Sequence, residues 1–396
     1  MEFRRVPSLP PYVFAVTDQL KLELRRGGQD VIDLGFGNPD LASPEVAVEK
    51  LTEAATKPRN HRYSASRGIP KLRSAICDLY RDRFRVELDP ETQAVATIGA
   101  KEGLAHLLWV LVQPGDTAVV PAPSYPIHLY APILAGASVV QVELGGSNDE
   151  LYDRLSDAFT RSRPRPRALV VSFPHNPTTR VVDLGFMERL VALARENDAL
   201  VVHDFAYADV SFDGYKPPSI LQVPGADEVA VETYSLTKSF SMAGWRVGFM
   251  LGNADAVAAL GRLKSYLDYG TFQPIQIAAT VVMNEAPEYP SEVAELYRSR
   301  RDSLCNGLNR VGWAVPPPRG TMFVWAELPE PYRGMPSMEF AMKLAREAKV
   351  AVSPGSGFGP GGDGHVRFAL VENEQRILQA IRSIRRALPE LRAAAV

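Results

Sequence analysis

The chain has 396 residues, a formal net charge of −2 and 46% hydrophobic residues. Its length exceeds what one compact core normally holds, so we expect two lobes, and its near-neutral charge argues against a nucleic-acid or membrane partner. The two cysteines, Cys77 and Cys305, lack the spacing of a metal site or a disulfide framework, which indicates a reduced, cytoplasmic setting without a bound metal.

Residues 1–45 are rich in loop-forming residues, and VIDLGFGNPD at 31–40 is their one strand-like run. From 94 to 250, short β-branched runs alternate with segments of helical period, beginning with a strand at 94–99 and a helix from residue 100. Further strands are predicted within 116–126, 167–178, 199–210 and 227–239, and an amphipathic helix at 183–198.

These strands are apolar at nearly every position, which is typical of strands buried on both faces. The alternation therefore predicts an α/β fold whose mainly parallel, doubly wound sheet is covered by helices on both faces. We assign residues 46–285 to this large domain. After residue 285, a long charged helix is followed by mixed strands and helices, so residues 1–45 and 286–396 together are expected to form a small α+β domain.

Polar residues follow several of the predicted strands at the point where each strand ends. They are Gly99 to Lys101, Asn176, Asp204 and Lys238. In a doubly wound sheet, ligands bind beyond the carboxyl ends of the strands. We therefore expect these residues to face one crevice, in a cleft between the two lobes.

The chemistry of these residues points to one kind of ligand. A desolvated Lys238 would lose its proton readily and could form a Schiff base with an aldehyde, although most lysines are surface residues. A buried Asp204 needs a cation such as a protonated ring nitrogen, although a helix cap or core salt bridge is the alternative. The turn at Gly99 opens a helix and, with Ser235 and Arg246, could hold a phosphate. Pyridoxal 5′-phosphate has all three groups.

The same residues lie in a series of motifs that resembles the fold-type I, class I pyridoxal-phosphate aminotransferases. In chain order the motifs are VIDLGFGNPD (31–40), YSASRGIPKLR (63–73), TIGAKEGL (97–104), PAPSYP (121–126), NPT (176–178), DFAY (204–207), SLTKSFSMAGWRVGF (235–249) and HVRFAL (365–370). Their order and spacing are kept over nearly the whole chain, which makes a chance match implausible.

The resemblance implies a role for each residue that matches a motif. Lys238 would form the Schiff base and move the proton, Asp204 would keep the pyridine nitrogen protonated, and Tyr207 would bind the ring oxygen. The implied cofactor-binding residues are Gly99, Ala100, Lys101, Tyr125, Asn176, Asp204, Tyr207, Ser235, Lys238 and Arg246, with Tyr63 from the partner subunit of a homodimer. The implied substrate-binding residues are Gly37, Asn176, Arg367 and Tyr12, with Arg367 clamping the α-carboxylate.

Simpler interpretations stay open for some of these residues. Tyr125 and Tyr207 could be core aromatics, and Tyr63 a helix-entry residue. His175 and His203 are interpreted as packed or hydrogen-bonded histidines, not as metal ligands or acid–base groups. Many family members have glycine after Asn-Pro-Thr, whereas this chain has Thr179, so the turn could have another conformation.

Longer segments are similar to bacterial alanine (glutamate–pyruvate) aminotransferases, among them SYPIHLYAPILAGA (124–137) and KSYLDYGTFQPIQIAA (264–279). This similarity implies ping-pong exchange of an amino group between an L-amino acid and a 2-oxo acid. LL-diaminopimelate, methionine and aromatic aminotransferases are the alternatives, followed by a lyase on the same fold. No second arginine for a dicarboxylate is identifiable, and Tyr12, Tyr125, Tyr266 and Tyr269 would form an aromatic pocket wall.

Some regulators carry a non-catalytic aminotransferase-like domain that binds an effector. No basic helix-turn-helix segment precedes residue 30, which argues against this alternative. A nicotinamide dehydrogenase is disfavoured because no glycine fingerprint with a downstream acidic residue follows an early strand.

Overall fold

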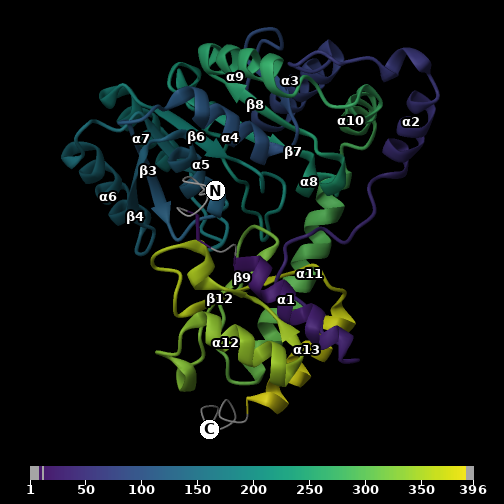
Figure 1. Cartoon of the computed structure of the whole chain (residues 1–396), viewed down its shortest axis with the longest axis vertical. Coiled ribbons are helices and arrows are strands. Elements are labelled where there is room, and N and C mark those ends of the chain that lie inside the picture. The colour runs from purple at the N-terminus through teal and green to yellow at the C-terminus, as the bar shows by residue number, and fades with distance from the viewer. Residues whose placement is uncertain (1–8, 11–12, 389–396) are drawn as a thin grey trace, which may run out of the picture.

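The structure is a computed structural model that describes residues 9–10 and 13–388. Figure 1 shows a large sheet with its helices in the upper half and two small sheets with theirs in the lower half. Within the described residues, no helix is both long enough and apolar enough to span a membrane. Cys77 and Cys305 are both buried free thiols.

The large sheet has seven strands in the order β2-β8-β7-β6-β5-β3-β4. The strands are β2 (Ala94–Thr97), β3 (Thr117–Ala122), β4 (Ser138–Glu143), β5 (Ala168–Val171), β6 (Leu200–Asp204), β7 (Ala230–Ser235) and β8 (Gly248–Gly252). All neighbours pair in parallel except β8, which runs antiparallel to both β7 and β2. The predicted mainly parallel sheet is therefore confirmed.

Helices cover both faces of this sheet. Its helices are α2 (Glu45–Ala55), α3 (Pro70–Phe84), α4 (Ala100–Leu111), α5 (Pro126–Ala135), α6 (Asn148–Arg161), α7 (Leu184–Asn197), α8 (Leu236–Ser239), α9 (Ala254–Leu267) and α10 (Gln273–Glu285). Because side chains alternate across a strand, Leu169 and Val201 enter one hydrophobic core with α3, α6 and α7, while Val170 and Val202 enter another with α4 and α9. The sheet therefore lies between two hydrophobic cores.

The lower half has its own core and two small sheets. Strand β1 (Ile32–Asp33) pairs with β10 (Val350–Ala351), and β12 (His365–Ala369) lies between β11 (Ser353–Pro354) and β9 (Phe323–Glu327). The helices are α1 (Val13–Arg26), α11 (Tyr289–Arg310), α12 (Ser337–Lys343) and α13 (Glu374–Ala387). Tyr207, Val210 and Phe212, which follow β6 in the chain, pack into this lower core. The division of the chain at residues 45 and 285 stays a proposal.

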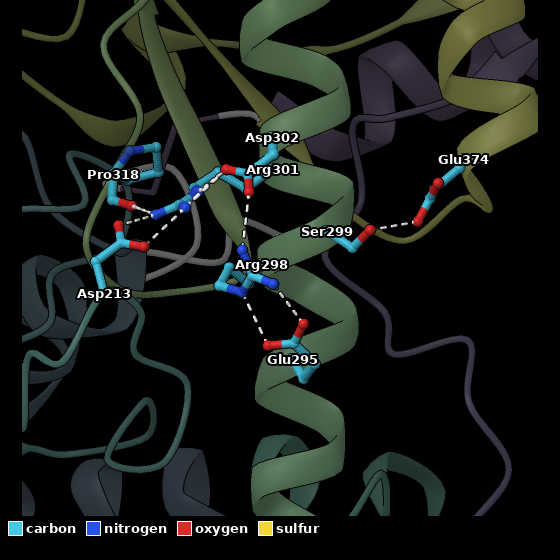
Figure 2. A network of polar contacts seen from close by, with 8 residues as sticks. All are labelled: Asp213, Glu295, Arg298, Ser299, Arg301, Asp302, Pro318 and Glu374. Carbon is cyan, nitrogen blue, oxygen red and sulfur yellow. Dashed lines mark hydrogen bonds and ion pairs between the residues drawn. The ribbon is translucent and has the colours of Figure 1, made fainter.

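Charged side chains tie the long helix α11 to the segment that follows β6, as Figure 2 shows. Arg301 is 3% exposed and pairs with Asp213, at 2.5 Å from Nη1 to Oδ2, and with the carbonyl of Pro318 at 2.9 Å. Arg301 also donates to Asp302, the next residue of α11. A buried guanidinium with several acceptors favours one arrangement of the elements it joins.

The turn that follows β5 keeps a left-handed conformation despite having no glycine. Thr179 has φ of 61°, and its N–H donates to the carbonyl of His175 at 2.8 Å. A β-branched residue at positive φ is strained because Cβ crowds the following carbonyl. Residue 179 is a threonine where many similar proteins have glycine. It nevertheless adopts the left-handed conformation that glycine adopts easily.

Thr179→Gly should stabilise the protein. Relief of strain contributes about 1–3 kcal/mol, and the added flexibility of the unfolded chain removes about 0.5–1 kcal/mol, so the free energy of unfolding should rise by roughly 1 kcal/mol. The measurement is the shift in urea midpoint against wild type. Thr56→Gly is the control, because Thr56 has φ of −76° and its loss should lower stability. A similar decrease for both variants would contradict the strain.

Candidate active site

A cavity of about 400 Å³ lies where the carboxyl ends of β5, β6 and β7 meet the small sheets. Predicted site residues that line it are Gly37, Ala100, Lys101, Tyr125, Asn176, Asp204, Tyr207, Ser235, Lys238, Arg246 and Arg367. They come from segments spread over most of the chain. The parallel sheet collects them because its strands end along one edge.

Lys238 lies in α8, the short helix that begins directly after β7. Its Nζ donates to the carbonyl oxygen of Gly37 at 2.7 Å. Removal from water lowers the pKa of Lys238 to about 7, and the positive charges of Arg367 and Arg246 act in the same direction. A large share of the amine is therefore neutral near pH 7, which makes it a nucleophile and a base.

Asp204 ends β6 and is 7% exposed. Burial by itself would raise the pKa of this carboxyl group, but the hydrogen bond to His128 and the one from Thr233 outweigh it, so the pKa lies below its usual value. Asp204 Oδ2 lies 2.8 Å from His128 Nε2, and Thr233 Oγ1 donates to Oδ1 at 3.0 Å. His128 Nδ1 lies 2.9 Å from the hydroxyl of Ser124. This chain of contacts holds an ionised carboxylate toward the cavity.

The first turn of α4 forms one end of the cavity, and this end can bind an anion. Gly99 caps this helix with φ of 77°, and a Cβ atom there would overlap the guanidinium of Arg246. The absent side chain therefore leaves room for Arg246 next to the N–H groups of the first turn of α4. Ser235 is 4% exposed and lines the same part of the cavity. Amides, a hydroxyl and a guanidinium together fit a phosphate group.

Arg367 enters the cavity from β12 and is 2% exposed. Its Nη1 donates to Asn176 Oδ1 at 2.6 Å, and its Nη2 donates to the carbonyl of Gly35 at 3.1 Å. Its guanidinium carbon lies 3.9 Å from the centroid of the Phe323 ring. Such a buried, oriented fork suits a carboxylate of a ligand.

Two tyrosines complete the cavity. Tyr207 is buried, burial raises its pKa above the usual value, and its ring meets that of Phe323 edge-on at 5.6 Å. Tyr125 stands at the start of α5, and the ammonium of Lys101 lies 5.3 Å from its ring centroid. Both rings can contact a planar ligand, and the Tyr207 hydroxyl is protonated at neutral pH.

Some predicted residues lie elsewhere. Gly99 adjoins the cavity without lining it, and Tyr12 lies outside the described residues. Tyr63 is 89% exposed on the surface, with its ring 5.2 Å from that of Tyr269. The prediction that Tyr266 and Tyr269 form part of the cavity wall is wrong for a single chain, because neither residue lines the cavity. The reason is that they stand exposed at the end of α9 and just beyond it.

Sequence reasoning missed the groups that support Asp204 and Arg367. His128 interrupts the apolar helix α5, and this polar residue in an apolar run was the signal that could have identified it. No comparable feature of the sequence marks Phe323 or Thr233. His203 points away from Asp204, with its Nδ1 2.7 Å from Glu232, and therefore belongs to a buried polar cluster outside the cavity.

The pKa of Lys238 predicts a pH dependence of stability for the ligand-free protein. The unfolded chain keeps this proton up to about pH 10.5, whereas the folded protein loses it near pH 7. Between these values the unfolded state binds more protons, so stability should rise with pH. The measurement is the difference in urea midpoint between wild type and Lys238→Met across this window. A difference that is constant with pH would contradict the lowered pKa.

Comparisons with known proteins agree with this geometry. The chain matches the family Aminotransferase class I and II over residues 29–384. It is 54% identical to the glutamate-pyruvate aminotransferase AlaC of Escherichia coli strain K12, covering 97% of this chain and 93% of the relative. It is 42% identical to the LL-diaminopimelate aminotransferase of Desulforudis audaxviator, covering 98% of both chains.

Solved structures show the same fold. Substrate-bound BacF from Bacillus subtilis superposes with a TM-score of 0.90 at 32% identity, covering 98% of this chain and 97% of BacF. The predicted fold class, the family resemblance and the assignment as an enzyme are thereby confirmed. The chain belongs to the class I and II aminotransferase family.

Proposed function

We propose that this aminotransferase binds pyridoxal 5′-phosphate and exchanges the amino group between an L-amino acid and a 2-oxo acid by a ping-pong mechanism. The observation that carries the proposal is that one cavity holds a lysine amine of lowered pKa, a buried carboxylate and two arginines. Alanine with pyruvate and glutamate with 2-oxoglutarate are the proposed substrates. The 54% identity to a glutamate-pyruvate aminotransferase supports this choice.

The donor set fits each group of this cofactor. The start of α4, Ser235 and Arg246 would hold the phosphate, and Asp204 would hold a proton on the ring nitrogen. When bound, the cofactor supplies an aldehyde that takes up amino groups and a cationic ring that withdraws electrons from the substrate. Asn176 and Tyr207 would orient the ring through its oxygen, and Tyr125 would lie against its face.

Lys238 and Arg367 would act on the substrate. Arg367 would bind the α-carboxylate through its two-pronged fork, next to Gly37 and Asn176. This contact would place the Cα hydrogen within the same small cavity as Lys238 Nζ. The neutral amine of Lys238 would then take the proton from Cα and deliver it to the carbon atom of the cofactor's aldehyde group.

A homodimer is part of the proposal. Tyr63, Tyr266, Tyr269 and Phe272 are exposed aromatic side chains of neighbouring segments. Tyr63 is 89% exposed, which is unusual for a tyrosine in a well-packed domain. We propose that this surface contacts a second copy and that Tyr63 reaches the phosphate site there. A cytoplasmic location remains an inference from the low cysteine content.

A second candidate has a specific observation in its favour. An LL-diaminopimelate aminotransferase is 42% identical to this chain over 98% of both proteins. LL-diaminopimelate would undergo the same reaction and make the same contact with Arg367. The two candidates therefore differ only in the substrate side chain, and a direct comparison of substrates separates them.

The test of the proposed function is trapping on Lys238. Reduction of the cofactor-loaded protein with borohydride should attach the cofactor covalently to the peptide that contains Lys238, detected by mass spectrometry. Addition of L-alanine, L-glutamate or LL-diaminopimelate before reduction should prevent attachment if that amino acid is a substrate. Absence of the adduct in saturated protein would overturn the cofactor assignment.

Asp204→Ala should bind the cofactor but react slowly. Loss of the carboxylate removes electrostatic stabilisation that is used in the transition state, so kcat should fall by about a thousandfold or more. Stopped-flow absorbance of the reaction with L-alanine measures this effect. Asp198→Ala is the control, because Asp198 is an exposed carboxylate at the end of α7. Near-wild-type turnover in Asp204→Ala would contradict the role of Asp204.

A further inference from the structure

Lys264 is a lysine of α9 whose side chain is enclosed by protein. The residue is 0% exposed, and its Nζ donates to Glu102 Oε1 at 3.0 Å and to Asp268 Oδ1 at 3.3 Å. Most lysines keep their ammonium group in water, and an enclosed one needs acidic partners. Lys264 does not line the cavity of the candidate active site. Its ammonium is therefore bound to the two carboxylates, not to a ligand in that cavity.

The side chains around Lys264 have the spacing of a metal site. Glu102, His106 and Asp268 each offer one ligand atom, and these atoms lie within 4.8 Å of one another. His106 Nδ1 lies 2.6 Å from Glu102 Oε1. The ammonium of Lys264, however, already donates to both carboxylates. The chain therefore supplies its own cation to this group of four residues, which we call the α4–α9 charge cluster.

Glu102 connects the α4–α9 charge cluster to the turn that opens α4. Its second oxygen, Oε2, accepts the N–H of Ile98 at 2.7 Å. The carbonyl oxygen of Ile98 accepts from Arg246 Nη2 at 3.5 Å. Gly99, the N-cap residue of α4, follows directly. The turn at which the cofactor phosphate would bind is therefore held between Glu102 and Arg246.

A carboxylate at this position has two opposite effects. The hydrogen bond from Ile98 to Glu102 fixes the turn, but a negative charge in the first turn of α4 would repel a phosphate bound at the same helix start. A cation beside Glu102 offsets that charge. Lys264 provides it from α9, which packs against α4 in one hydrophobic core. Because the ammonium is enclosed, salt ions screen this interaction little.

We propose that Lys264 is a positioning residue for phosphate binding, because it neutralises Glu102 while Glu102 holds the backbone of Ile98 next to the phosphate turn. The inference rests on the proposed function, in which the anion at this turn is the phosphate of the cofactor. Neither Glu102 nor Lys264 lines the cavity, so both act through the turn and not by contact with the ligand. Affinity for the phosphate therefore depends on a charge pair outside the cavity.

Lys264→Met tests the proposal because methionine fills similar space without the charge. In titrations of the cofactor-free full chain, the Kd of pyridoxal 5′-phosphate should rise about 10- to 100-fold, as expected for an uncompensated charge at short range. The Kd of pyridoxal, which has no phosphate, should stay within about threefold of wild type. The double variant Glu102→Gln/Lys264→Met should recover most of the affinity, because Gln removes the uncompensated charge and keeps an oxygen for the Ile98 N–H.

Lys21→Met is the matched control, since Lys21 is a buried lysine of α1 that pairs with Asp33 and does not line the cavity. It should lower stability without changing the ratio of the two Kd values. Equal losses of affinity for both ligands in Lys264→Met, or no recovery in the double variant, would overturn the proposal and make Lys264 a purely structural residue.

Failure of the proposed function would have a different signature. If the wild-type chain does not bind pyridoxal 5′-phosphate, the cofactor assignment fails, and calorimetric titration with inorganic phosphate still tests the charge pair. Lys264→Met should then weaken phosphate binding, and the double variant should restore it. Equal binding by all three chains, or binding by none of them, would overturn the role of Lys264.

Discussion

The structure depends on keeping an amine and a carboxylate, both largely withdrawn from water, in one cavity without letting them pair. Asp204 is instead bonded to His128 and Thr233, and Lys238 donates to the carbonyl of Gly37. If the two groups formed an ion pair, the lysine would keep its proton and lose its reactivity. Their separation follows from their positions, since Asp204 ends β6 and Lys238 follows the adjacent strand β7.

The cavity is assembled from both halves of the molecule. Gly37 and Arg367 come from the part with the small sheets, whereas Asn176, Asp204 and Lys238 lie at or just beyond the ends of strands of the large sheet. The bonds from Lys238 to Gly37 and from Arg367 to Asn176 cross between these parts. The tie between Arg301 and Asp213 reinforces the same junction (Figure 2). The geometry of the cavity therefore depends on the arrangement of the two halves.

Distribution of charge explains how one cavity can combine several anionic groups. Arg246 and Arg367 stand at different points of the wall, so a phosphate and an α-carboxylate would not compete for one partner. Desolvation by burial lowers the pKa of Lys238, and the positive charges of Arg367 and Arg246 lower it further. The two arginines that could bind anions thus also make the amine of Lys238 easier to deprotonate.

The sequence by itself determined the strand order along the chain, the mainly parallel sheet and the residues at strand ends, because hydrophobic period and strand position are local properties. It identified Lys238, Asp204, Arg246 and Arg367 through motifs. Only the tertiary structure decided which strand runs antiparallel and that His128 supports Asp204 from 76 residues away. These features depend on contacts between distant segments, which no local pattern encodes.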